Sequence, residues 1–139
     1  MTFKNPEPEA IRELLRSVKT IAVVGFSPKP GRPSHSIARQ LQRFGYRVIP
    51  VRPGISEGLG EKAYANLSAV PDPIDLVDVF RSPSQAPAIV EECLRLGLKA
   101  IWMQEGAATE AAALAALAGG MKVVMDRCIM RDYNRLMPG

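Results

Sequence analysis

The sequence predicts a doubly wound α/β sandwich, with helices on both faces of a five-stranded parallel sheet. Five short, nearly continuous apolar runs alternate with segments in which apolar residues recur every three to four positions. Apolar runs without polar alternation are typical of strands covered on both faces, as in a parallel sheet. Most connections between the runs are short, so right-handed crossovers place the helices in two layers around the sheet.

Each apolar run is expected to form one strand. The runs are Thr20–Val24, Arg47–Val51, Asp75–Phe80, Ala100–Met103 and Lys122–Met125. Numbered along the chain, these strands are expected to lie in the order 3-2-1-4-5 across the sheet.

Four segments have the apolar spacing of helices and precede or separate the strands. They are residues 8–18, Ser34 to Gly45, Pro87 to Gly97 and Thr109 to Gly119. Glycine ends three of them because it readily adopts the left-handed conformation found at helix C-termini. The side chain of Thr109 can cap the fourth helix.

Two segments do not fit this alternation. Residues 54–73 are irregular, with a short helical piece expected around Ala65 to Val70, and they act either as a lid or as a connector. Residues 131–139 are expected to be a C-terminal tail. The chain is therefore predicted to be one domain over residues 1–139, with a leading helix at about 8–18 and a core at about 19–130.

The composition is that of one soluble globular domain: 139 residues, 47% apolar and 23% charged. Cys93 and Cys128 lie far apart and have no metal-ligand spacing, which favours a reducing cytoplasm over a disulfide framework. No apolar segment approaches the roughly 20 residues that span a bilayer, so no membrane partner is expected. A net charge of +4 suggests an anionic partner, but the absence of a dense basic stripe argues against nucleic acid.

The stretch VVGFSPKPGRPS follows the first strand. Open α/β sheets bind ligands at the carboxyl ends of their strands, where amides at a helix N-terminus favour anions. Only the first glycine of Gly-x-Gly-x-x-Gly is in place, as Gly25, and Lys29 and Arg32 add positive charge. Ser27 and Ser34 add hydroxyl groups, and three prolines lower the entropy lost on ordering the loop. The loop predicts a ligand richer in phosphate than NAD, although a proline-rich surface turn with two solvated cations fits equally well.

The second strand ends in Val51-Arg52-Pro53. NAD-dependent enzymes carry an Asp or Glu at this point, which binds the ribose hydroxyls. A cation in that place favours a ligand with an extra phosphate on the adenosine ribose, either NADP or coenzyme A. The alternative is an exposed arginine at a strand end, without a binding role.

Five segments, in order, lie at or near the carboxyl ends of the predicted strands. They read IAVVGFSPKPGRPS, GYRVIPVRP, LVDVFRSP, WMQEGA and VVMDRCIM, and they extend from about Val18 to Met130. Together they resemble the small stand-alone CoA-binding proteins, which are similar to the N-terminal domain of the succinyl-CoA synthetase alpha subunit. The resemblance implies a Rossmann-like domain that holds the nucleotide end of CoA over the carboxyl edge of its sheet.

The resemblance also implies binding residues at four strand ends. The candidates at and beside the matching positions are Gly25, Phe26, Ser27, Lys29, Arg32, Ser34, Val51, Arg52, Pro53, Phe80, Arg81, Pro83, Gln104, Glu105 and Gly106. The four cations in this set can offset the roughly four negative charges of CoA. We expect Glu105 to point away from the phosphates or to pair with a cation.

Cys128 is a further candidate, because a thiol near the pantetheine end of CoA can form a mixed disulfide. A buried small hydrophobe is the favoured interpretation of this cysteine. Cys93 and Trp102 are expected in the core, and the single histidine, His35, in the first turn of the second helix.

Asp75 and Asp78 are not expected to form a catalytic pair. Three residues apart on a strand, their side chains face opposite sides of the sheet. We expect Asp75 to cap a strand end and Asp78 to have a buried hydrogen-bond partner.

These features predict a protein that binds CoA or an acyl-CoA through its phosphates and adenosine. No catalytic or metal-binding constellation is recognised, so the prediction is a carrier, sensor or partner-dependent module rather than an enzyme. Whether it forms a homo-oligomer or binds a protein partner is left open. An NADP-binding oxidoreductase domain and a regulatory subunit with a vestigial pocket are the alternatives.

Overall fold

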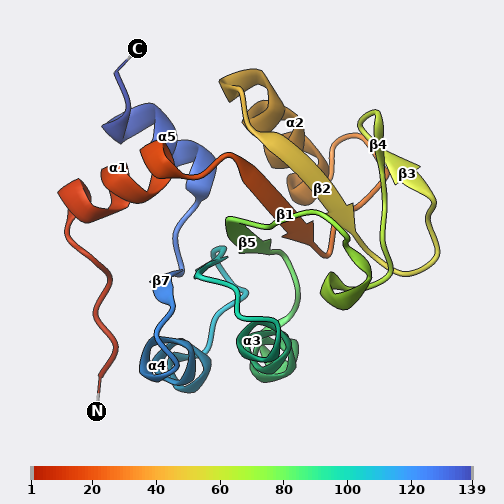
Figure 1. Ribbon diagram of the computed structural model, residues 1–139. Helices are drawn as coiled ribbons and strands as arrows, with labels where there is room; N and C mark the ends of the chain where they lie inside the picture. Colours follow the sequence, from red (N-terminus) through yellow and green to blue (C-terminus); the bar gives the residue numbers. More distant parts are fainter. Residues whose placement is uncertain (1, 139) are drawn as a thin grey trace.

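A five-stranded parallel sheet forms the centre of the computed structural model, which describes residues 2–138 (Figure 1). Its strands are β1 (Thr20–Val24), β2 (Arg47–Val51), β5 (Leu76–Val79), β6 (Ala100–Met103) and β7 (Lys122–Met125). Every predicted strand is present, and the α/β sandwich with a five-stranded parallel sheet is confirmed.

The strand order is β2-β1-β5-β6-β7, so the predicted order 3-2-1-4-5 is wrong. The third predicted strand, β5, pairs with β1 and not with β2, with Leu76 opposite Ile21. To reach this position from β2, the chain passes back across β1. A right-handed return in that direction uses the face of the sheet that helix α2 leaves free. The connecting segment packs on that face through Leu67.

Pro50 explains why β2 lies at the edge of the sheet. Its carbonyl oxygen accepts a hydrogen bond from Tyr64 N at 3.1 Å on the outer side of β2. The Pro50 nitrogen, which has no proton to donate, faces the same outer side. Proline is largely confined to edge strands for this reason, and the predicted order would have placed it in an interior strand.

Helices cover both faces of the sheet (Figure 1). On one face lie α1 (Pro8–Ser17), α2 (Pro33–Phe44) and α5 (Ile129–Leu136), and on the other lie α3 (Ala86–Arg95) and α4 (Glu110–Ala118). Thr109 caps α4 as predicted, because its Oγ1 accepts a hydrogen bond from Ala112 N at 3.1 Å. Gly45 ends α2 with a φ of 109°.

Helix α5 occupies most of the segment predicted to be a C-terminal tail, so that prediction is wrong. Ile129, Tyr133 and Leu136 recur at helical spacing, and Ile129 is fully buried. The Tyr133 ring stacks on Phe44 with centroids 3.7 Å apart. The same spacing is visible in the sequence, and this helix could have been predicted from it.

Residues 54–73 contain a small hairpin and a 3₁₀ helix. The hairpin joins β3 (Glu57–Gly58) to β4 (Glu61–Lys62), and the 3₁₀ helix η1 (Leu67–Ala69) lies within the predicted helical piece. Gln42 Nε2 donates a hydrogen bond to Leu59 O at 2.9 Å. Gly58 lies against the Phe26 ring so closely that a Cβ there would be 2.5 Å from a ring carbon. The hairpin is therefore packed against the loop that follows β1.

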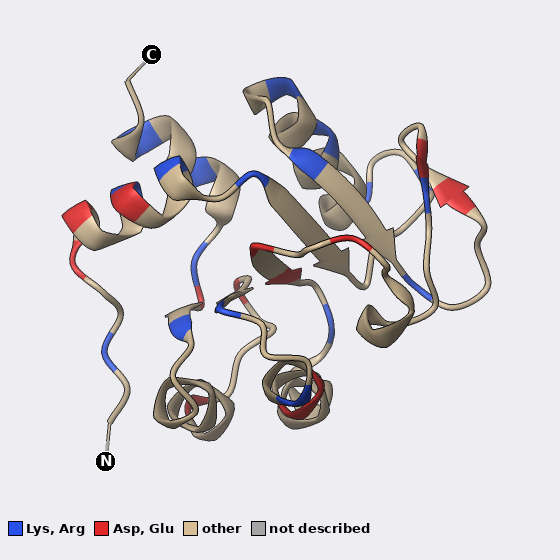
Figure 2. Ribbon diagram, viewed as in Figure 1, with Lys and Arg blue, Asp and Glu red and all other residues tan. Residues whose placement is uncertain are grey.

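None of the helices within residues 2–138 has the length and apolar character needed to cross a membrane. Across the same residues, Lys and Arg are spread over α1, α2, α5 and several loops rather than along a single element (Figure 2).

Candidate functional site

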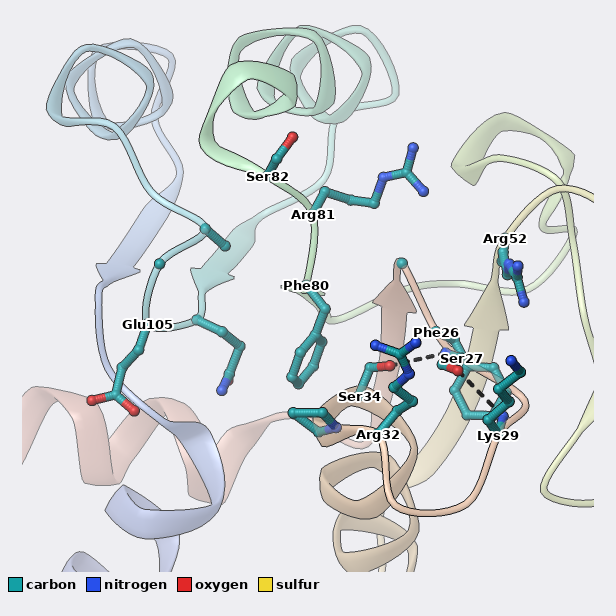
Figure 3. A pocket seen from close by; sticks show the side chains of 15 residues that line it. Phe26, Ser27, Lys29, Arg32, Ser34, Arg52, Phe80, Arg81, Ser82 and Glu105 are labelled. Carbon is teal, nitrogen blue, oxygen red and sulfur yellow. Dashed lines mark hydrogen bonds between the residues drawn. The ribbon is translucent and has the colours of Figure 1, made fainter.

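A cavity of about 610 Å³ lies at the carboxyl edge of the sheet, where the loops after β1, β2, β5 and β6 meet (Figure 3). Its volume is within the usual range for small-molecule sites. Most of the predicted residues line it: Gly25, Phe26, Ser27, Lys29, Arg32, Ser34, Arg52, Phe80, Arg81, Gln104, Glu105 and Gly106. Pro33, Ser82 and Ala107 also line it and were not predicted, although each is the chain neighbour of a predicted residue.

The other predicted residues, Val51, Pro53, Pro83 and Cys128, do not line this cavity. Val51 is buried in the sheet, while Pro53 and Pro83 are exposed outside the cavity. Cys128 is 6% exposed and belongs to the core on the α5 face. The favoured interpretation of Cys128 as a small buried hydrophobe therefore agrees with its position.

Cys93 is fully buried, as predicted, and burial raises the pKa of its thiol to about 12. Because only the thiolate is an effective nucleophile, this side chain is unreactive. Trp102 is also fully buried, and its Nε1 donates a hydrogen bond to Arg127 O at 2.8 Å.

The turn after β1 requires glycine. Gly25 has a φ of 87°, which non-glycine residues rarely adopt. A Cβ at this position would lie 2.8 Å from Phe80 O and 2.8 Å from Arg81 Cδ. The turn therefore brings the first loop directly against the end of β5, one strand away.

Two serines hold the loop that follows Gly25. Ser34 Oγ accepts a hydrogen bond from Ser27 N at 2.9 Å, and Ser27 Oγ accepts one from Lys29 N at 3.2 Å (Figure 3). The N-cap residue of α2, Arg32, makes no capping hydrogen bond with its side chain. The first-turn amides of α2 therefore lie at the cavity without a side-chain cap, in the arrangement that favours bound anions.

Four side chains give the cavity its positive charge, and we call them the cavity cations: Lys29, Arg32, Arg52 and Arg81. Within residues 2–138, no carboxylate oxygen lies within 4 Å of any of their charged nitrogens. Arg81 Nε instead donates a hydrogen bond to the neutral amide oxygen of Gln85. The four charges extend from the loops after β1, β2 and β5 around one cavity (Figure 3), so the site is electrostatically suited to an anion.

The one acidic side chain in the lining is paired with a cation. Glu105 Oε2 lies 3.2 Å from Arg131 Nη1 of α5, and its carboxylate is set apart from Ser27, Lys29 and Arg32 (Figure 3). The expectation that Glu105 pairs with a cation is therefore confirmed.

Asp75 and Asp78 have different surroundings. Asp75 Oδ2 accepts hydrogen bonds from Lys19 N at 3.0 Å and Thr20 N at 2.9 Å, so it caps the start of β1 as predicted. Asp78 is completely buried, and within residues 2–138 neither of its carboxyl oxygens has a hydrogen-bond partner. The prediction that Asp78 has a buried hydrogen-bond partner is therefore wrong. Burial raises the pKa of the Asp78 carboxyl well above its usual range.

His35 lies in the first turn of α2, as predicted, but it does not line the cavity. Its ring lies 5.7 Å from the Phe26 ring, centroid to centroid.

The observed strand order places the cavity at the switch point of the sheet. From β1, the chain crosses in one direction to β2, and β5 then adds on the other side of β1. Open α/β sheets bind ligands at this point, where the loops after two adjacent strands diverge. The fold and the cavity together define a Rossmann-like domain with a basic site at its switch point.

The family profile described as "CoA binding domain" matches residues 19–134. The chain belongs to this CoA-binding domain family, as the resemblance in its sequence implied.

Similar proteins include both small and large chains. The uncharacterized protein YneT of Bacillus subtilis is 42% identical over 127 residues, which cover 91% of this chain and 94% of YneT. The acetate–CoA ligase (ADP-forming) I subunit alpha of Pyrococcus furiosus is 30% identical over 95 residues, which cover 64% of this chain but 21% of that subunit. A solved structure of a hypothetical protein from Pyrococcus horikoshii OT3 is 37% identical, with a TM-score of 0.91, and the match covers 99% of this chain and 100% of that one.

Proposed function

We propose that this protein binds coenzyme A or an acyl-CoA, through its phosphates and adenosine, in the cavity at the carboxyl edge of the sheet. The observation that carries the proposal is the set of cavity cations, which surround a cavity of about 610 Å³ and have no carboxylate partner within residues 2–138. Four positive charges around one cavity create a positive potential there, which favours an anionic ligand.

The protein acts as a CoA-binding module without catalytic residues of its own. In the ligase subunit of Pyrococcus furiosus, the part similar to this chain is 21% of the whole. We propose that this chain corresponds to a CoA-binding part alone, because the rest of that subunit has no counterpart in the matched region. The two cysteines are both free, which supports a reducing compartment such as the cytoplasm as its location.

Isothermal titration with CoA, NADP and NAD tests the proposal. CoA is expected to bind most tightly, because the turn lacks the second and third glycines of a dinucleotide site and the loop carries two cations. Tighter binding of NADP than of CoA would overturn the proposal.

Dephospho-CoA is expected to bind more weakly than CoA, and Arg52→Ala should remove that preference. Equal affinity of the wild-type protein for the two would exclude Arg52 as the partner of the ribose phosphate.

Lys29→Ala and Arg81→Ala should each weaken CoA binding by about 1.5–3 kcal/mol, as expected for the loss of a charge-assisted hydrogen bond. The control is Arg95→Ala, which removes the same charge from an exposed position in the last turn of α3, outside the cavity. If all three variants lose affinity equally, the effect comes from net charge and not from the cavity. A vestigial pocket would be indicated if CoA fails to raise the melting temperature of the wild-type protein.

A further inference from the structure

Gln104 lines the cavity with a side chain that is bonded at one end only. The residue is 4% exposed, and its Oε1 accepts a hydrogen bond from Ile129 N at 3.1 Å. A backbone N–H can only donate, so the accepting atom must be the amide oxygen and the position of Nε2 is fixed. Within residues 2–138, Nε2 donates to no protein atom, and it is not among the fully buried unpartnered atoms. Nε2 is therefore not sealed away from solvent, and Gln104 lies in the wall of the cavity.

The other end of Gln104 holds the first turn of α5. The N-cap residue of this helix, Cys128, makes no capping hydrogen bond with its side chain. The Ile129 amide therefore depends on Gln104, which follows β6, for its partner. The next residue along the chain, Glu105, also reaches α5 through its ion pair with Arg131. Two consecutive residues of the cavity wall thus contact the same helical turn.

We propose that Gln104 couples occupancy of the cavity to the seating of α5: Nε2 donates to an acceptor oxygen of bound CoA while Oε1 holds the Ile129 amide. The inference rests on the proposed function. When Nε2 has no partner, the side-chain amide of Gln104 is held only by its hydrogen bond to Ile129 N, and this bond breaks more easily. A ligand oxygen on Nε2 fixes the side-chain torsion that both hydrogen bonds share.

The coupling is reciprocal: if CoA binds the cavity more tightly when α5 is seated, then bound CoA also makes the seated position of α5 more stable. One additional hydrogen bond of about 1 kcal/mol corresponds to about a fivefold change in an equilibrium. Opening of the first turn of α5 should therefore become about fivefold rarer when CoA is bound, beyond any general stabilisation of the fold.

Amide hydrogen exchange measures this opening. In the wild-type protein, saturating CoA should slow exchange of the Ile129 amide about fivefold more than that of the Ala112 amide. Ala112 N is a matched reference, because Thr109 Oγ1 caps it with a hydrogen bond of the same 3.1 Å length and neither residue lines the cavity.

Two variants separate the two ends of Gln104. Gln104→Glu, studied at pH 8, keeps an oxygen for Ile129 N but replaces the cavity donor with a negative oxygen. It should seat α5 normally without ligand, bind CoA about tenfold or more weakly, and show no extra slowing at Ile129 when saturated. Gln104→Met removes both hydrogen bonds and should speed exchange at Ile129 even without CoA.

The outcomes distinguish this inference from the proposed function. If the wild-type protein binds no CoA, the proposed function fails and the inference fails with it. If CoA binds but slows Ile129 no more than Ala112, the inference alone is wrong. It is also wrong if Gln104→Glu binds CoA with wild-type affinity.

Discussion

Gly25→Ala is expected to weaken CoA binding by roughly 100-fold or more and to lower the free energy of unfolding by about 2–4 kcal/mol. At a φ of 87°, alanine pays a steric cost of about 1–2 kcal/mol between its Cβ and its own backbone. The new Cβ also lies 2.8 Å from Phe80 O, a backbone atom that cannot rotate away. The first loop must then separate from the end of β5, which moves Lys29 and Arg81 apart. Titration with CoA and urea denaturation measure the two effects.

Gly31→Ala is the matched control for this substitution. Gly31 lies in the same loop and has a φ of 94°, but a Cβ there meets no atom within 4 Å. Gly31→Ala should therefore lower the free energy of unfolding only by the backbone strain of about 1–2 kcal/mol, and it should leave CoA affinity within a few-fold of wild type. Equal losses of affinity in the two variants would show that the contact of Gly25 with Phe80 and Arg81 does not position the site.

Most of the cavity lining could be predicted because it depends on one property of parallel sheets. The carboxyl ends of all the strands lie at the same edge, so the residues that follow each strand meet there whatever the order of the strands. Arg52, Arg81 and Gln104 were placed correctly although the predicted strand order was wrong. Whether a strand-end residue such as Val51 lines the cavity depends on which way its side chain faces, and this direction was not predicted.

The strand order was harder to predict, because both orders bury β5 between layers of helices. The sequence does hold one physical signal, since Pro50 is suited to an edge strand and unsuited to an interior one. The irregular segment 54–73 is a second signal, because a chain returning across β1 needs a connection but not a full helix. Helix α5 follows from the spacing of Ile129, Tyr133 and Leu136, which the prediction of a tail overlooked.

The surroundings of Asp78 could not be predicted from the sequence. The neighbours of a strand residue are set by pairing with strands far away in the chain. In the observed register, Asp78 lies between Val23 of β1 and Trp102 of β6, neither of which offers a hydrogen bond to its carboxyl oxygens. A carboxyl group in an apolar setting without partners is costly to bury, and the cost rises steeply when it is ionised.

Asp78→Asn is expected to remove a loss of stability that the wild-type protein suffers as the pH rises. Because burial raises the pKa of Asp78 in the folded state, the folded protein keeps this proton at pH values where the unfolded chain, with a pKa near 3.9, has released it. The stabilising contribution of the proton is therefore complete below about pH 4. As the pH rises towards the folded-state pKa, the free energy of unfolding falls by about 1.4 kcal/mol per pH unit. Asparagine has nearly the same shape and cannot ionise, so the variant should match wild type near pH 4 and exceed its stability at pH 8.

Urea denaturation of both proteins between pH 4 and pH 9 measures this difference, with Asp75→Ala as a control of opposite sign. Asp75 lies three residues before Asp78, but its carboxylate accepts hydrogen bonds from two backbone amides at the start of β1. Removing that acceptor should lower the free energy of unfolding by about 1–3 kcal/mol, because the two amides lose their partner. If wild type and Asp78→Asn instead change in parallel across the whole pH range, the Asp78 carboxyl titrates alike in the folded and unfolded chains, and it must then have contact with water or a polar partner.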